Sequence, residues 1–435
     1  MTITMTVGFI VIFWYVDMNT KSPEIIFDPL INSRPLPTFA PLTNDTDYDP
    51  QGYNDQSGLP AREPEPSPPD APESTRHVAR PPDWDASITP AVPNDDTIWH
   101  TGSFELPISG ATGYAGASLH VRRLNDLSSD ILQTLPAGKG FIILIENDDW
   151  WYIKLDDESG GWVEHRFCFV NLPDIIPSIV YNITNSYDSI YTSSGKAIPN
   201  VTYEELYTAY IYNARYGRYE FIVPVYYSTA KKIHSAQQSA LADGNTLVLY
   251  EAFRPYDVQQ TIGREFLSLV SSDADVNAGV NTGAWSTSSF VATLSNHQRG
   301  GAIDVSLGRI DDSVVLTTGD YFYVRVTEYY EYNMQTPMHE LSAASVLFKS
   351  YIRLNSFGSL RTSDLIDTVT PETLKLMEYC MLAGLTPLAS EWWHYDDHQG
   401  IQRAAAAGVS GRYRIEENFS VSPRNPDRDD ELVNG

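Results

Sequence analysis

The stretch Leu294–Leu307, LSNHQRGGAIDVSL, contains one histidine and, seven residues later, one aspartate. Asp304 lies in a short apolar run, where a carboxylate is costly to bury unless another group pairs with it. The glycine pair at 300–301 permits a sharp backbone turn, and Ala302–Leu307 alternates like a β-strand. A loop that folds back over this strand would bring His297 and Asp304 to one point.

Two interpretations of this stretch remain open on sequence grounds. In one, Asp304 pairs with Arg299 and His297 lies at the surface. In the other, His297 and Asp304 both face a third group, such as a metal ion. The two cysteines, Cys168 and Cys380, lie far apart in the chain, which excludes a disulfide framework and a CxxC metal pair. Any metal must therefore be bound by histidine or carboxylate side chains.

A second candidate histidine lies in SEWWHYDD, where Glu391 and His394 are three residues apart. On a regular strand these two side chains point to opposite faces, so they converge only if the backbone bends or bulges. A glutamate beside a metal site can act as general base toward water. The alternative is an aromatic core strand in which the histidine is simply hydrogen-bonded.

The third candidate segment is YEAFRPYDVQQ, Tyr250–Gln260, in which Arg254 stands at the end of an apolar strand and immediately before a proline. An arginine fixed at the end of a strand can stabilise an oxyanion during addition to a carbonyl. A structural ion pair is the alternative role for Arg254.

Taken in this order, FRP, SNHxxGxAxD and EWWHY resemble the zinc D-alanyl-D-alanine dipeptidase and D,D-carboxypeptidase family, and the resemblance extends from Asn171 onward. It implies one zinc ion bound by His297, Asp304 and His394, with Glu391 as catalytic base, Arg254 as transition-state stabiliser and Ser295 lining the substrate pocket. The resemblance transfers no role to His339 or His398, and we expect a surface or packing role for each.

The segment 174–410 is expected to be this peptidase domain, an α+β fold with an antiparallel sheet and helices. Periodicity predicts helices over 221–246, 256–270 and near 342–353, and a helix capped by Thr370 that ends at Gly384. Strands are expected in TLVLYEAF, in DYFYVRVTEYY and in SEWWHYDD.

Short alternating runs separated by turn residues predict a small all-β barrel over residues 106–173. The runs LHVR, LPAG, WWYI and GWV resemble the xLxVR, LPxG, WWxI and GWV pattern of bacterial SH3-like domains. Such modules often bind cell-wall peptides, and the alternatives are a structural spacer or a docking site for a protein partner.

The N-terminal part divides into a short apolar segment, 1–20, and a linker, 21–105, that is acidic and rich in proline. The linker composition is typical of a disordered tether. The apolar segment is a candidate signal or membrane anchor, or marks a wrongly assigned start of the chain. Residues 411–435 are expected to form a polar C-terminal tail.

The formal net charge of −27 argues against nucleic acid and against anionic membranes as partners, apart from an N-terminal anchor. The resemblance implies hydrolysis of the D-Ala-D-Ala bond. The tether and the SH3-like module favour an extracytoplasmic or wall-associated carboxypeptidase that acts on peptidoglycan stem peptides. The alternatives are a cytoplasmic dipeptidase that takes the free dipeptide, and a wall-binding protein with a disabled catalytic domain.

Overall fold

The computed structural model describes residues 96–208, 210–350 and 364–427. The segment 1–20 and all of the linker up to residue 95 lie outside this range, so their predicted roles stay predictions, as do the domain boundaries. No helix in the described residues is long and apolar enough to cross a membrane.

The larger domain is built around a mixed sheet with the strand order β1-β17-β16-β15-β9, and β19 and β18 extend it from β16. Its strands are β1 (Ile98–Trp99), β9 (Val180–Tyr181), β15 (Asn245–Glu251), β16 (Ala302–Thr318), β17 (Tyr321–Glu331), β18 (Thr386–Leu388) and β19 (Glu391–Asp396). The expected antiparallel sheet is therefore only partly right, because β9 pairs with β15 and β1 pairs with β17 in parallel. The long connections between these partners permit parallel pairing, which a short hairpin does not.

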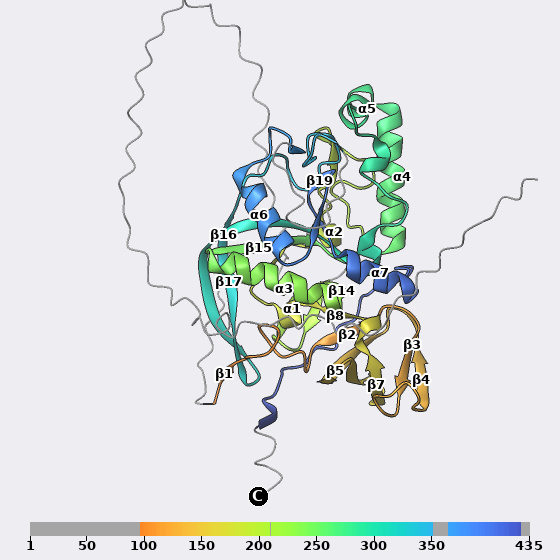
Figure 1. Cartoon of the computed structure of the whole chain (residues 1–435), viewed down its shortest axis with the longest axis vertical. Coiled ribbons are helices and arrows are strands. Elements are labelled where there is room, and N and C mark those ends of the chain that lie inside the picture. Colours follow the sequence, from red (N-terminus) through yellow and green to blue (C-terminus); the bar gives the residue numbers. More distant parts are fainter. Residues whose placement is uncertain (1–95, 209, 351–363, 428–435) are drawn as a thin grey trace, which may run out of the picture. The chain divides into compact units, whose positions relative to one another are not determined.

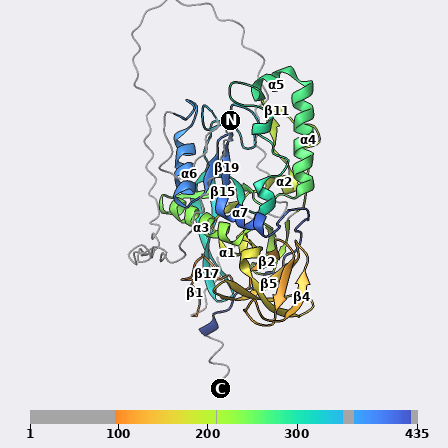
Figure 2. The same cartoon turned by 45° about the vertical axis from the view of Figure 1, so that its right-hand side comes forward.

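Helices flank this sheet, and β19 lies between α6 and α4 in both views (Figures 1 and 2). The helices are α1 (Leu172–Ile175), α2 (Thr184–Tyr187), α3 (Tyr227–Ala242), α4 (Tyr256–Ser272), α5 (Ala274–Val280), α6 (Pro371–Leu382) and α7 (His398–Ala406). Three short 3-10 helices are η1 (His165–Phe167), η2 (Thr287–Ser289) and η3 (Asn296–Arg299). Two small hairpins pair β10 (Thr192–Ser193) with β11 (Lys196–Ala197), and β12 (Tyr210–Asn213) with β13 (Arg218–Phe221).

Two helix predictions need correction. The helix expected from residue 221 begins only at Tyr227, because Pro224–Tyr226 forms strand β14. No helix is present over residues 342–350, the described part of the helix expected near 342–353. There the hydroxyl of Ser345 donates to the carbonyls of Ser342 and Ser390, and serines that bond to nearby backbone in this way compete with helix formation.

The second sheet is antiparallel at every pairing and has the order β14-β8-β2-β5-β6-β7-β3-β4. Its strands are β2 (Thr112–Ala115), β3 (Leu119–Arg122), β4 (Ile131–Leu135), β5 (Gly140–Asn147), β6 (Trp150–Lys154), β7 (Gly160–Glu164), β8 (Cys168–Asn171) and β14. Three motifs expected in strands lie in β3, β6 and β7, which confirms the all-β prediction, whereas the SH3-like identity stays a prediction.

The two sheets share one continuous hydrophobic core, which includes Trp151 from β6, Leu249 from β15 and Trp393 from β19. Strand β14, which follows the predicted domain boundary in sequence, pairs with β8 of the antiparallel sheet. The segment 411–427 also touches both parts. The Tyr413 ring stacks on Phe253, while its hydroxyl donates to the carbonyl of Gly116.

Candidate metal centre

The register of the larger sheet places three polar side chains in one row. Asp304 of β16 lies opposite Glu251 of β15 on one side and opposite His394 of β19 on the other. Residues directly opposite on neighbouring strands project from the same face of a sheet, so these three side chains meet. All three are buried.

The fourth side chain, His297, comes from the 3-10 helix η3, which directly precedes β16. The Ser295 hydroxyl accepts a hydrogen bond from the His297 N–H and caps this helix. Gly300 ends it with a φ of 63°, a left-handed conformation that glycine adopts without strain. The carbonyl of Gly300 accepts a hydrogen bond of 2.7 Å from Tyr226 of β14, which fixes the turn. The expected fold-back of the loop over the strand is confirmed.

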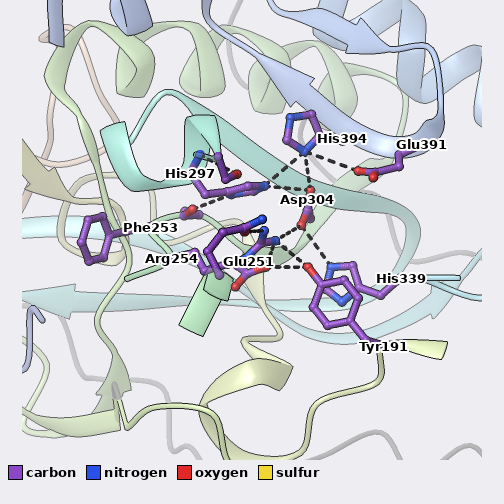
Figure 3. A network of polar contacts seen from close by, with 12 residues as sticks. Tyr191, Glu251, Phe253, Arg254, His297, Asp304, His339, Glu391 and His394 are labelled. Atoms are coloured by element: carbon purple, nitrogen blue, oxygen red, sulfur yellow. Dashed lines mark hydrogen bonds and ion pairs between the residues drawn. The ribbon is translucent and has the colours of Figure 1, made fainter. Parts of the chain in front are cut away.

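The candidate ligand atoms of His297, Asp304 and His394 form a compact triangle (Figure 3). The distance from His297 Nε2 to Asp304 Oδ1 is 3.2 Å, from His394 Nδ1 to the same oxygen 3.0 Å, and between the two nitrogens 3.1 Å. Ligand atoms about 2.0–2.1 Å from a tetrahedral zinc ion are separated by roughly 3.3–3.4 Å. The donor set and its spacing therefore fit zinc.

Each histidine is oriented by a hydrogen bond from its other ring nitrogen. His297 Nδ1 lies 2.6 Å from the carbonyl of Ala252, and His394 Nε2 lies 3.1 Å from Asp396 Oδ1. A backbone carbonyl only accepts, so the proton of His297 sits on Nδ1 and the lone pair of Nε2 faces the site. Outer partners of this kind fix the tautomer and the ring orientation of metal-binding histidines.

The second oxygen of Asp304 is held from the opposite direction. Its Oδ2 lies 3.2 Å from a terminal nitrogen of Arg254 and 3.1 Å from His339 Nε2. Burial alone would raise the pKa of Asp304, but His297 and the hydrogen bonds from the surrounding histidines hold this pKa well below its usual value. The carboxyl is therefore kept charged, as a metal ligand must be.

Arg254 fills the space between several acceptors. Its guanidinium donates to Glu251, Tyr191 and Asp304, and at 2.6 Å to Gln259. Burial opposes its charge, but chiefly Glu251 raises the pKa of Arg254 well above its usual value. Glu251, Asp304 and His339 also lie close enough together to bind a second metal ion. Since the fixed positive charge of Arg254 bridges the two carboxylates, a second cation would be repelled there.

Glu391 lies beside the triangle, with its Oε2 3.8 Å from His394 Nδ1. Glu391 and His394 converge because the pairing of β18 with β19 is irregular between Pro387 and Leu388. A strand irregularity of this kind is what the three-residue spacing of the two side chains required. Burial raises the pKa of Glu391 to about 8, although His394 acts to lower it. Trp392 and Trp393 are each 1% exposed and help to keep water from this part of the site.

The structure brings together five of the six predicted site residues, and it places the sixth, Ser295, at the cap of η3. Asp304 pairs with Arg254 rather than with Arg299, so the first interpretation of the opening stretch names the wrong arginine. Of the two histidines expected to have a surface or packing role, His339 is fully buried against Asp304 and aromatic rings, and His398 is exposed.

Sequence reasoning missed three residues of the site: Glu251, Tyr191 and Asp396. Glu251 carried a signal, since it is a carboxylate in an apolar strand, which is the feature that singled out Asp304. Asp396 could have been found as an acidic neighbour of a candidate metal histidine. Nothing in the sequence around Tyr191 indicates its hydrogen bonds to Glu251 and Arg254.

Comparison with known proteins agrees with this geometry. Residues 222–409 match the sequence model of the Peptidase_M15 family, described as D-ala-D-ala dipeptidase. No curated protein matches the chain. The matched range contains the three residues of the triangle together with Glu391 and Arg254. Residues 222–409 are therefore similar to the D-ala-D-ala dipeptidase family.

Proposed function

We propose that this protein is a zinc-dependent D,D-carboxypeptidase that removes the terminal D-alanine from peptidoglycan stem peptides. The observation that carries the proposal is the triangle of His297 Nε2, Asp304 Oδ1 and His394 Nδ1 with the Glu391 carboxyl beside it. Three protein ligands and an adjacent carboxylate are the arrangement of a catalytic zinc site, which keeps a further position for water.

The side chains divide the chemistry among them. When bound, zinc supplies Lewis acidity, which makes water more acidic and polarises a carbonyl group. Glu391 accepts the proton of the attacking water and returns it to the amine of the leaving D-alanine. Arg254 stabilises the negative charge that develops on the carbonyl oxygen. Ser295, half-buried at the cap of η3, lines the substrate pocket next to His297.

Two features support a stem peptide as the substrate. An antiparallel sheet that resembles a wall-binding module in sequence shares strand pairing and core with the peptidase domain. The acidic part of the predicted linker before residue 96 has a composition typical of a tether that separates a working domain from an anchor, whereas Ile98–Trp99 of that linker form β1 and pair with β17. Together they support an extracytoplasmic, wall-associated location.

A second candidate is hydrolysis of the free dipeptide D-Ala-D-Ala. The description of the matching family favours it, because that description names a dipeptidase. Under this alternative the enzyme would work in the cytoplasm, and the antiparallel sheet would serve as a structural support.

The experiment offers the purified, zinc-loaded full chain a stem pentapeptide ending in D-Ala-D-Ala and, separately, the free dipeptide. Released D-alanine is measured, and the two values of kcat/KM are compared. The carboxypeptidase proposal predicts a higher value for the pentapeptide. A higher value for the dipeptide would establish the second candidate, and zinc binding without hydrolysis of either peptide would indicate a disabled wall-binding protein.

A further inference from the structure

His339 lies in the connection between β17 and β18, and its side chain is completely buried. Its backbone has a φ of 59°, in the left-handed region that residues other than glycine seldom adopt. The carbonyl of His339 accepts a hydrogen bond of 3.1 Å from the N–H of Thr192, which pins the backbone in this conformation. An unfavourable conformation of this kind persists only where the surrounding structure fixes it.

Aromatic rings fix the orientation of the His339 side chain. Tyr191 stacks on it with ring centroids 4.1 Å apart and an angle of 7° between the ring planes. Trp393 meets it nearly edge-on at 5.9 Å, and Tyr250 does so at 6.4 Å. With rings packed on several sides, the imidazole cannot turn away from Asp304 without disturbing the core.

The contact between His339 and Asp304 has a defined direction. A charged carboxylate oxygen can only accept a hydrogen bond, so the N–H at His339 Nε2 donates a hydrogen bond of 3.1 Å to Asp304 Oδ2. The other ring nitrogen of His339 is buried without a hydrogen-bond partner among the described residues. The imidazole is thus committed to a single polar contact, and that contact is with Asp304.

Arg254 also donates to Asp304 Oδ2, but the same terminal nitrogen serves Glu251 and Tyr191. One nitrogen shared among three acceptors cannot by itself fix the rotation of the Asp304 carboxyl. His339 supplies a second donor, which approaches the same oxygen from a different element of the fold (Figure 3). With both donors on Oδ2, the other carboxylate oxygen, Oδ1, faces His297 and His394.

We infer that His339 is a positioning residue, which holds Asp304 Oδ2 so that Oδ1 completes the metal-binding triangle. The inference rests on the proposed zinc site but concerns metal affinity, which can be measured without any substrate. We therefore expect weaker zinc binding in any variant whose side chain at position 339 lacks a hydrogen-bond donor at the place of the imidazole Nε2.

Substituting His339 by glutamine or by asparagine gives two neutral amide side chains that differ in how far the donor nitrogen reaches. The amide nitrogen of His339→Gln can occupy the place of the imidazole Nε2, whereas the shorter side chain of His339→Asn reaches only the place of Nδ1. Asparagine tolerates the left-handed backbone better than glutamine does, so any relief of backbone strain favours the asparagine variant. His234→Asn, a substitution on α3 at a half-buried histidine that packs on Phe104, serves as the control.

The measurement is the zinc dissociation constant of each full-length variant, obtained by competition with a chromophoric chelator. We expect His339→Asn to bind zinc about 10–100-fold more weakly than the wild type, the usual effect of losing an outer hydrogen bond to a ligand. His339→Gln and His234→Asn should stay within about threefold of the wild type. The thermal midpoints of the metal-free variants show whether each one is folded.

Equal zinc affinities of the asparagine and glutamine variants, whether both normal or both weak, would overturn the inference. A wild type that binds no zinc would instead overturn the proposed function. Should the asparagine variant fail to fold, Tyr191→Leu removes the stacked ring, and Tyr191→Phe keeps it as the control. We then expect weaker zinc binding for the leucine variant than for the phenylalanine variant, and equal affinities would contradict the inference.

Discussion

The turn at Gly300 determines where His297 lies relative to Asp304. Replacing this glycine should therefore weaken zinc binding, although Gly300 is not itself a ligand. A Cβ atom at position 300 would lie 2.8 Å from the backbone nitrogen of Tyr226 and 2.9 Å from the ring of Phe169. Both distances are shorter than van der Waals contact, and the Tyr226 nitrogen belongs to a paired strand. We therefore expect Gly300→Ala to shift the loop rather than the strand.

The size of the effect follows from two contributions. An L-residue in the left-handed conformation costs about 1–2 kcal/mol. Overpacking a well-filled site adds about 1–3 kcal/mol. Gly300→Ala should thus lower the free energy of unfolding by about 2–5 kcal/mol. Gly244→Ala is the matched control, because Gly244 has a similar φ of 73° but a Cβ atom added there would meet no other atom within 4 Å. Gly244→Ala should lower the free energy of unfolding by only about 1–2 kcal/mol.

Urea unfolding of the metal-free proteins measures the stability, and chelator competition measures the zinc affinity. We expect Gly300→Ala to bind zinc about tenfold more weakly or worse, comparable to the loss of an outer partner of a ligand. Gly244→Ala should bind zinc as the wild type does. Equal destabilisation of the two variants together with unchanged zinc affinity of Gly300→Ala would refute the reasoning.

Further predictions concern the base, a ligand and a half-buried carboxyl distant from the site. Glu391→Gln should retain zinc but lose about 10²–10⁴-fold in kcat, and full activity would exclude Glu391 as the base. His394→Ala should lose the metal, so stoichiometric zinc by elemental analysis would exclude it as a ligand. Burial raises the pKa of Glu105 from its usual 4.5 to about 7, against the hydrogen bonds from Ser178. A carboxyl with a raised pKa in the folded state favours folding at low pH, and this contribution is lost as the pH rises through about 7. Urea unfolding should show that, between pH 4.5 and 8, the free energy of unfolding of the wild type falls by about 3 kcal/mol relative to that of Glu105→Gln. Parallel pH profiles of the two proteins would contradict this.

Local patterns in the sequence predicted the parts of the site that depend on neighbouring residues. The glycine pair after His297 indicated a turn, and the alternation after it indicated the strand that carries Asp304. Thr370 followed by a proline marked the start of α6, and its side chain does accept the capping hydrogen bond from Thr373. Each of these features is fixed by interactions within a few residues, which the sequence displays directly.

Contacts between distant residues could not be predicted in this way. The role of His339 depends on Asp304 and Tyr191, which lie 35 and 148 positions before it in the chain. The mixed sheet depends on parallel pairing of β9 with β15 and of β1 with β17, which the two-residue strands β9 and β1 hardly reveal in sequence. Over residues 342–350 helix propensity was overridden by hydrogen bonds to neighbouring segments, such as the one from Leu347 to Ala389.

The central claim is that the triangle of His297, Asp304 and His394 holds a zinc ion that is needed to hydrolyse D-Ala-D-Ala bonds. The most direct test prepares the full-length protein free of metal and adds zinc in steps, while D-alanine released from a stem pentapeptide is measured. We predict no hydrolysis without metal and activity that saturates at one zinc ion per chain. Hydrolysis that persists in the metal-free protein, or saturation with zinc without release of D-alanine, would contradict the claim.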